Sequence, residues 1–226
     1  MANRTDPSAL SIHGTDPQNL IEKIVRNRIH AAKYWNEECF GLTAVTMVDK
    51  AMELKHVGGT YGGNKKASPF LCLLLKFLQL SPEKEIAIAF IDNDDYRYMR
   101  CLGAFYLRLI GKAVDIYQYL EPLYNDFRRI RFRNPDGTYS VTHVDEFVDQ
   151  LLTEDRVCDV ILPRILPRRV LEEIGVLQRR VSILEEELES DPENKNEASG
   201  SPVREKEKKK KKKSKDKEKE KDKEKD

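Results

Sequence analysis

The sequence holds few of the side chains that build metal centres, disulfides or catalytic nucleophiles. It has four cysteines and four histidines among 226 residues. No two cysteines form a C-x-x-C pair, and the histidines show none of the spacings usual for metal ligands. We therefore expect no metal ion, no other cofactor and no enzymatic activity, because chemistry near neutral pH usually recruits such groups. The cysteines are expected to be reduced, buried thiols of an intracellular protein. These residues are Cys39, Cys72, Cys101, Cys158, His13, His30, His56 and His143.

Long hydrophobic stretches are also missing. The longest, Phe70–Leu80, has eleven residues and is interrupted by Lys76 and Gln79. A membrane-spanning helix needs about 20 consecutive apolar residues, so we expect no membrane association. The first ten residues, MANRTDPSAL, contain no apolar core of a secretory signal, and no secretion is expected.

The chain as a whole has no excess of one charge, but two of its segments do. The formal net charge is +1, from 40 lysines and arginines against 39 aspartates and glutamates. Residues 185–203 hold 7 acidic and 1 basic side chains, whereas residues 204–226 hold 14 basic and 8 acidic ones. After residue 189 only Ala198 and Val203 are hydrophobic. We therefore expect a near-neutral folded body and a disordered tail that cannot bury a core.

Helix signals dominate the body. Three dipeptides combine a capping side chain with proline at the first helical position, namely Asp16-Pro17, Ser68-Pro69 and Ser81-Pro82. Apolar residues recur at helical spacing after these caps and in several later segments. Further helices are expected from Thr43, over 94–111, over 114–126 with a division at Pro122, over 143–152 and over 157–162.

The helical period is interrupted once by strict alternation. Polar and apolar residues alternate over Arg129–Arg133, turn residues follow over Asn134–Gly137, and alternation resumes at Tyr139. This pattern indicates a short β-hairpin with a basic outer face.

The predicted fold class is all-α: a mainly helical single domain over residues 1–169 with this one short hairpin. Residues 170–189 are expected to form a C-terminal extended, amphipathic helix, and residues 190–226 a disordered acidic and basic tail. The helix has the heptad-like spacing of a coiled coil but is too short to form one alone, so it needs a partner or the domain body. Its apolar positions are Val170, Ile174, Leu177, Val181, Leu184 and Leu188.

Two motifs resemble ligand-binding loops. Gly58–Gly63 reads G-G-T-Y-G-G, but it lacks the G-K-[ST] ending of a phosphate loop and follows a predicted helix instead of a strand. A tight loop with positive φ at several positions is the favoured interpretation. Asp92–Asp95 resembles the start of a calcium loop, but Arg97 occupies the position of the required glycine. A capping cluster for the following helix is favoured there.

The strongest binding signal is arginine. At 100° per residue three arginines of the 94–111 helix fall on one narrow stripe, and four more follow in or beside the hairpin. Guanidinium groups suit carboxylates and phosphates, so an acidic peptide and RNA both fit, although no RNP1-like motif is present. Internal pairing with the acids of a neutral body is an equally open alternative. The residues are Arg97, Arg100 and Arg108, then Arg128, Arg129, Arg131 and Arg133.

The tail contains six lysines in a row, which predicts a nuclear-import signal or a weak nucleic-acid tether. Nuclear import is the preferred interpretation, and beyond residue 213 a solvated tail of alternating charge is favoured. The candidate import residues are Lys208, Lys209, Lys210, Lys211, Lys212 and Lys213.

Several blocks, in order, resemble the pre-mRNA-splicing factor 38 family in its animal form. They lie within residues 10–188 and read ECFGLTA (Glu38–Ala44), VDKAMEL (Val48–Leu54), VGGTYGG (Val57–Gly63), YLEPLYNDFR (Tyr119–Arg128), HVDEF (His143–Phe147) and RVCDVILPR (Arg156–Arg164).

The resemblance implies a helical, non-enzymatic scaffold of the nucleus that joins the precatalytic spliceosome with the tri-snRNP and is needed for its activation. Its implied partners are a microfibrillar-associated splicing protein, a zinc-finger splicing protein and tri-snRNP components. Many animal members end in arginine/serine-rich tails, whereas this tail consists of Lys, Glu and Asp.

Partner contacts are expected on the arginine stripe, on the segment around the YLEPLYNDFR block and on the C-terminal helix. The competing function is direct RNA binding through Arg128–Arg133 and the lysine-rich tail. The expected contact residues are Arg97, Arg100, Arg108, Tyr117, Tyr119, Glu121, Tyr124, Asp126, Arg128, Arg129, Leu177, Val181 and Leu184.

Overall fold

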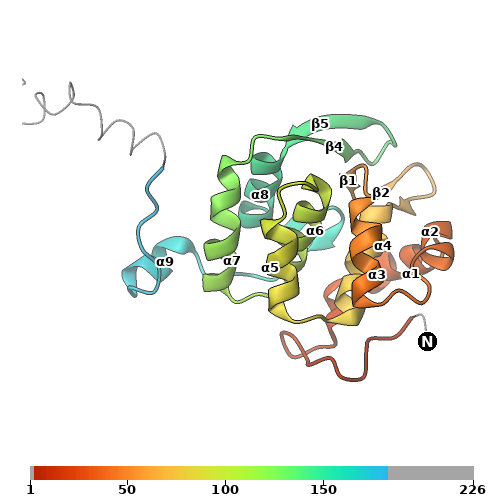
Figure 1. Cartoon of the computed structure of the whole chain (residues 1–226), viewed down its shortest axis with the longest axis horizontal. Coiled ribbons are helices and arrows are strands. Elements are labelled where there is room, and N and C mark those ends of the chain that lie inside the picture. Colours follow the sequence, from red (N-terminus) through yellow and green to blue (C-terminus); the bar gives the residue numbers. More distant parts are fainter. Residues whose placement is uncertain (1–2, 183–226) are drawn as a thin grey trace, which may run out of the picture. The chain divides into compact units, whose positions relative to one another are not determined.

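The computed structural model describes residues 3–182. The chain divides into two units, Met1–Leu177 and Gln178–Asp226, and every element named below belongs to the first (Figure 1). Its helices are α1 (Lys23–His30), α2 (Lys33–Glu37), α3 (Ala44–Met52), α4 (Pro69–Leu80), α5 (Lys84–Asp92), α6 (Arg97–Ile110), α7 (Ala113–Leu120), α8 (Val144–Thr153) and α9 (Arg168–Glu173), with 3₁₀ turns η1 (Pro17–Leu20) and η2 (Glu121–Asn125). Its strands are β1 (Val57–Gly58), β2 (Thr60–Tyr61), β3 (Lys66–Ala67), β4 (Arg129–Arg133), β5 (Tyr139–His143), β6 (Arg156–Val157) and β7 (Val160–Ile161).

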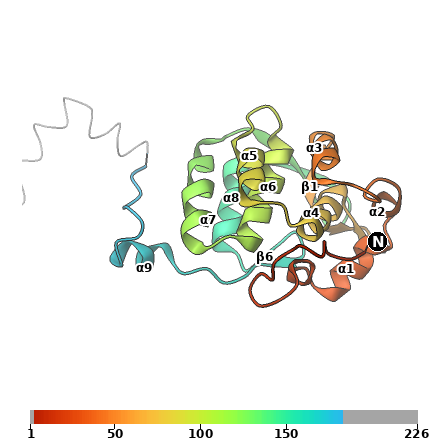
Figure 2. The ribbon, with the colours of Figure 1, turned by 60° about the horizontal axis from the view of Figure 1, so that its bottom comes forward.

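Two helices form the interior of the domain. α4 and α6 contact each other, and every residue from Phe70 to Gln79 and from Met99 to Leu109 is buried. Helices α1 and α2 pack against α4, helices α5, α7 and α8 pack against α6, and α3 contacts both α4 and α6 (Figures 1 and 2). Aromatic rings join the two helices, with Phe77 stacked on Tyr106 at 4.1 Å between ring centroids. The prediction of a mainly helical domain is confirmed in part, because helices form the interior but the domain also contains short strands beyond the one predicted hairpin.

Of the three predicted helix starts, the one at Ser68 is confirmed, the one at Ser81 is wrong, and the one at Asp16 begins a 3₁₀ turn. Ser68 caps α4 by accepting the backbone N–H of Leu71 at 3.1 Å. The prediction for Ser81 is wrong, because this residue ends α4 in a left-handed conformation and its hydroxyl donates to the Leu78 carbonyl at 2.7 Å. Helix α5 starts afterwards, at Lys84. Asp16 opens only the turn η1, and α1 begins later along the chain.

The strands form three small sheets. The predicted hairpin is confirmed as β4 and β5, which pair with Arg131 opposite Val141. Strand β1 adds to β4 in parallel and gives the order β1-β4-β5, a pairing that alternation within the hairpin could not reveal. The glycine-rich stretch runs from β1 into the β2–β3 hairpin, with positive φ at Gly58 and Gly62.

The helix predicted over 157–162 is wrong, because this segment is the hairpin β6–β7. Its two turn residues, Cys158 and Asp159, have φ values of 50° and 65°, which suits a two-residue hairpin turn. The Asp159 carboxylate accepts the backbone N–H and the hydroxyl of Thr60 at 2.7 and 2.8 Å. Gly59 allows this approach, since a Cβ there would lie 2.5 Å from Asp159 Oδ2.

The C-terminal helix predicted over 170–189 is wrong over 174–182. Helix α9 ends at Glu173, and Gly175 has a φ of 77°, a conformation that ends helices and that glycine adopts without strain. Leu177 and Val181 therefore share no helical face. Leu184, Leu188 and the lysine run Lys208–Lys213 lie outside the described residues.

All four cysteines are buried and free. Burial raises the pKa of the Cys39 and Cys101 thiols to about 12 and raises the pKa of Cys72 and Cys158 as well. Within residues 3–182 no three His, Cys, Asp or Glu side chains gather as a metal site would require. No helix in this part of the chain is long and apolar enough to cross a membrane.

Candidate interaction surface

Two of the three arginines in the stripe predicted on α6, Arg100 and Arg108, are buried, whereas Arg97 is exposed. Arg108 is 4% exposed, and its guanidinium donates from Nε to the Leu151 carbonyl and from Nη1 to the Pro163 carbonyl, both at 2.7 Å. Arg97 donates to the Arg129 carbonyl at 2.8 Å. Of the two interpretations left open by the sequence, internal bonding describes Arg108. It ties α6 to α8 and to the segment after β7.

Asp126 is the acceptor for a second internal network. Its carboxylate, 7% exposed, accepts from Arg100 at 2.6 Å and from Arg128 Nε at 2.7 Å, and Arg100 also pairs with Asp94. Burial alone would raise the pKa of Asp126, but the hydrogen bonds from Arg128 and Arg100 outweigh it and lower the pKa to about 2. Internal pairing, one of the two interpretations left open by the sequence, therefore also describes Arg100, whose side chain is 9% exposed.

The polar residues expected around η2 also bond within the domain. The Tyr117 hydroxyl donates to the Leu166 carbonyl at 3.2 Å, and the Tyr124 hydroxyl donates to Asp149 at 3.0 Å. Glu121 accepts from Arg168, and the Tyr119 ring lies 5.2 Å from the Lys84 ammonium. These contacts hold α7, α8 and α9 in place. To bind a partner, these side chains would have to give up their contacts within the domain. The residues concerned are Tyr117, Tyr119, Glu121 and Tyr124.

The outer face of the β4–β5 hairpin is basic, as the alternation predicts, and it is also partly apolar, which the alternation did not predict. Arg129 and Arg131 are exposed, and Val141 opposite Arg131 is 67% exposed. At the end of the hairpin, the Arg133 guanidinium lies over the Tyr61 ring at 3.4 Å and over the Tyr139 ring at 5.2 Å. Cation–π contact of this kind holds both rings in defined positions.

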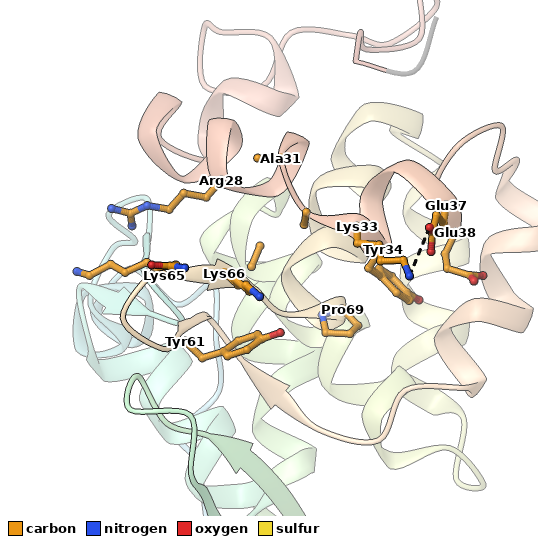
Figure 3. A pocket seen from close by; sticks show the side chains of 13 residues that line it. Arg28, Ala31, Lys33, Tyr34, Glu37, Glu38, Tyr61, Lys65, Lys66 and Pro69 are labelled. Carbon is orange, nitrogen blue, oxygen red and sulfur yellow. Dashed lines mark ion pairs between the residues drawn. The ribbon is translucent and has the colours of Figure 1, made fainter.

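A groove of about 680 Å³ lies between the α1–α2 segment and the β2–β3 hairpin (Figure 3). Tyr34, Tyr61 and Pro69 supply its apolar surface. A smaller hollow of about 320 Å³ shares Tyr34 and Pro69 with it and reaches Arg131 and Tyr139 on the β4–β5 face. The groove and the basic hairpin face are therefore neighbouring parts of one surface.

Opposite charges line the two ends of the groove. Arg28 and Lys65 lie at one end of the view in Figure 3, and Glu37 and Glu38 at the other. Lys66 lies between these ends. Glu38 accepts from Lys50, which is outside the groove, at 2.8 Å.

The groove wall is held by the neighbouring hairpin. The Gly62 backbone N–H donates to the Pro135 carbonyl in the β4–β5 turn at 2.8 Å, and the Lys65 N–H donates to the Gly62 carbonyl at 2.9 Å. These bonds and the Arg133–Tyr61 stack position the lysines. Sequence reasoning favoured a tight loop over a phosphate loop for Gly58–Gly63 and missed the groove. The pair Lys65-Lys66, separated from the glycines only by Asn64, was the available signal.

Comparison with known proteins places this chain in a family. The sequence pattern of the PRP38 family matches residues 10–175. Pre-mRNA-splicing factor 38A of Xenopus laevis is 62% identical over 189 residues, which cover 84% of this chain and 61% of that protein. Pre-mRNA-splicing factor 38 of Arabidopsis thaliana is 60% identical over 189 residues, covering 84% of this chain and 53% of that protein. The chain thus spans about half to three fifths of the length of these relatives.

A solved structure has the same fold. A chain in the crystal structure of the Snu23-Prp38-MFAP1(217-258) complex of Chaetomium thermophilum is 40% identical to this one, with a TM-score of 0.73. The match covers 80% of this chain and 98% of that chain.

Proposed function

Because the chain belongs to the PRP38 family, we propose that it is a non-enzymatic splicing factor that binds other splicing proteins in the precatalytic spliceosome and is required for spliceosome activation. In this proposal the folded domain is a scaffold, and its binding partners are the counterparts of Snu23 and MFAP1 in its own organism together with tri-snRNP components. The lysine run Lys208–Lys213 would direct the protein to the nucleus.

One observation carries the proposal: the likeness to a chain from a three-protein complex extends over nearly the whole of that chain. The geometry adds support, because the described residues offer an extended surface of groove and hairpin face. Most of the polar groups of α6 and η2 are meanwhile bonded inside the domain, which suits a rigid scaffold.

The test has a binding part and a functional part. The purified full chain is mixed with purified Snu23 and MFAP1 counterparts, and complex formation is followed by size-exclusion chromatography with light scattering. In nuclear extract depleted of the protein, splicing complexes should assemble but stall before activation, as followed on native gels. Addition of the purified chain should restore activation. Absence of both binding and rescue would reject the proposal.

A second function, direct RNA binding, is favoured by one observation. Arg129 and Arg131 are exposed, and neither guanidinium makes an ion pair within the part of the chain that the structure describes. Arg128, by contrast, is bound to Asp126. Affinity for a single-stranded RNA should then fall steeply with salt and fall further in an R129E/R131E variant. An unchanged RNA affinity in that variant would reject this function.

A further inference from the structure

We propose that the groove between α1–α2 and the β2–β3 hairpin binds an extended segment of a protein partner, acidic at one end, apolar in the middle and basic at the other. This inference rests on the proposed function and names the chemistry of the partner at one site. The partner segment would follow the groove from Arg28 and Lys65 towards Glu37 and Glu38 (Figure 3).

The basic end of the groove is available for a carboxylate. Arg28, Lys65 and Lys66 make no ion pair with any described residue. Lys65 and Lys66 are exposed, and Arg28 is half-buried. Lys33, the fourth cation of the groove, is already paired with Glu37 at 3.6 Å. Arginine and lysine positioned without internal partners bind carboxylates through charge-assisted hydrogen bonds.

The middle of the groove is preorganised for an apolar side chain. The Arg133 guanidinium covers one face of Tyr61 at 3.4 Å. Tyr34 is half-buried opposite, and Pro69 lies between the two rings in the view of Figure 3. A volume of about 680 Å³ is within the ~300–1,000 Å³ of sites that bury compact ligands, so several side chains fit. Rings that are already ordered lose little freedom on binding.

The acidic end selects against nucleic acid. Glu37 and Glu38 are both exposed and are paired with Lys33 at 3.6 Å and Lys50 at 2.8 Å, so this end of the groove offers no net positive charge to a phosphodiester backbone. A phosphate beside these carboxylates would meet charge of its own sign, whereas a lysine or arginine of a peptide would share the carboxylates with Lys33 and Lys50. The bipolar lining therefore favours a protein segment over RNA.

The test uses the full chain and overlapping peptides that cover the Snu23 and MFAP1 counterparts, with binding measured by fluorescence polarisation at low salt. K65E/K66E should weaken the best-binding peptide about tenfold, which corresponds to ~1.4 kcal/mol. Replacing the acidic residues of that peptide by lysine should restore its binding to this variant. The matched control is K23E/K112E, which changes the net charge equally at two exposed positions outside the groove and should bind as the parent chain does.

The acidic end is tested separately. E37K/E38K should weaken the same peptide and should also raise the affinity of the full chain for a poly-uridine oligonucleotide, because the groove would then be basic along its length. Circular dichroism checks that each variant is folded.

Three results would overturn the proposal. The first is unchanged binding of every peptide and of both whole partners by K65E/K66E. The second is an equal loss in K23E/K112E, since bulk charge would then explain the effect. The third is binding of poly-uridine by the parent chain that K65E/K66E abolishes while peptides remain unaffected. If the whole partners fail to bind the parent chain, the proposed function itself is rejected. If they bind the parent chain and the groove variants equally well, only the proposal for the groove is rejected.

Discussion

Replacing Asp126 by asparagine keeps the shape of the side chain and removes the charge that faces two arginines. In the folded protein the pKa of Asp126 falls from its ordinary value of 3.8 to about 2. This difference corresponds to ~2.4 kcal/mol of stability at neutral pH. The substitution also leaves Arg100, 9% exposed, without its buried counter-charge. We therefore expect Asp126→Asn to reduce the free energy of unfolding by about 2–4 kcal/mol.

The loss should depend on pH in a defined way. A carboxyl group whose pKa is lowered by folding contributes its full stability above its ordinary pKa and loses it as the pH falls through the folded value. With pKa values of 3.8 and about 2, the contribution is ~2.4 kcal/mol at pH 6, ~1.3 at pH 3 and ~0.4 at pH 2. The gap between the parent chain and Asp126→Asn should narrow accordingly.

Urea unfolding of the full chain measures this gap, with the fluorescence of Trp35 as the signal. Trp35 is the single tryptophan and is 2% exposed, so its emission reports on unfolding of the domain. The control is Asp94→Asn, which removes a partner of the same arginine, but one whose side chain is 87% exposed. That variant should lose less than about 1 kcal/mol. Equal losses in the two variants, or a gap that stays constant from pH 6 to pH 2, would refute the reasoning.

Three further predictions concern the domain interior. Arg108→Met should lower stability by about 2–4 kcal/mol in thermal unfolding, because the buried carbonyl of Leu151 and the part-buried carbonyl of Pro163 lose their donor. A melting temperature within about 2 °C of the parent would contradict this. Gly59→Ala should reduce the free energy of unfolding in urea by at least ~2 kcal/mol, since its Cβ would lie 2.5 Å from Asp159 Oδ2. Gly63→Ala, whose Cβ would have nothing within 4 Å, should reduce it by less than ~0.5 kcal/mol. Equal losses in the two variants would disprove the close approach. The pKa of His56 is lowered, by burial first and then by neighbouring arginines, so its contribution to stability is present above its ordinary pKa of 6.5 and is lost as the pH falls below it. His56→Gln should therefore flatten the pH dependence of stability between pH 5 and 7, and an unaltered slope would count against this.

Local signals were sufficient where an element is specified by its own residues. The Ser68-Pro69 pair predicts the start of α4 because both the cap and the proline act within the first turn. Helical periodicity likewise placed Arg108 on α6, but the angle on a helix does not reveal what packs there. The carbonyls of Leu151 and Pro163 come from distant segments, so the inward direction of Arg108 could not be predicted from α6 alone.

The groove and the hairpin β6–β7 depend on tertiary contacts in the same way. Apolar residues close together near Val157 fit a helix and a strand equally, and the deciding contact is Asp159 with Thr60, far apart in the sequence. The groove exists only because α1–α2 and the β2–β3 hairpin face each other in the folded domain. Its charges at Lys65 and Glu37 were visible in the sequence, but their arrangement along one cavity was not.

Burial of the native thiols makes the protein suitable for single-site labelling. Thiol reagents attack the thiolate, and burial together with the raised pKa values keeps the four native cysteines protonated and shielded. A cysteine introduced at exposed Asn64, in the wall of the groove, would then be the thiol that a maleimide dye reaches first in the folded chain. Such a dye would report on occupancy of the groove without prior replacement of the core residues Cys39, Cys72, Cys101 and Cys158, whose removal would itself disturb packing.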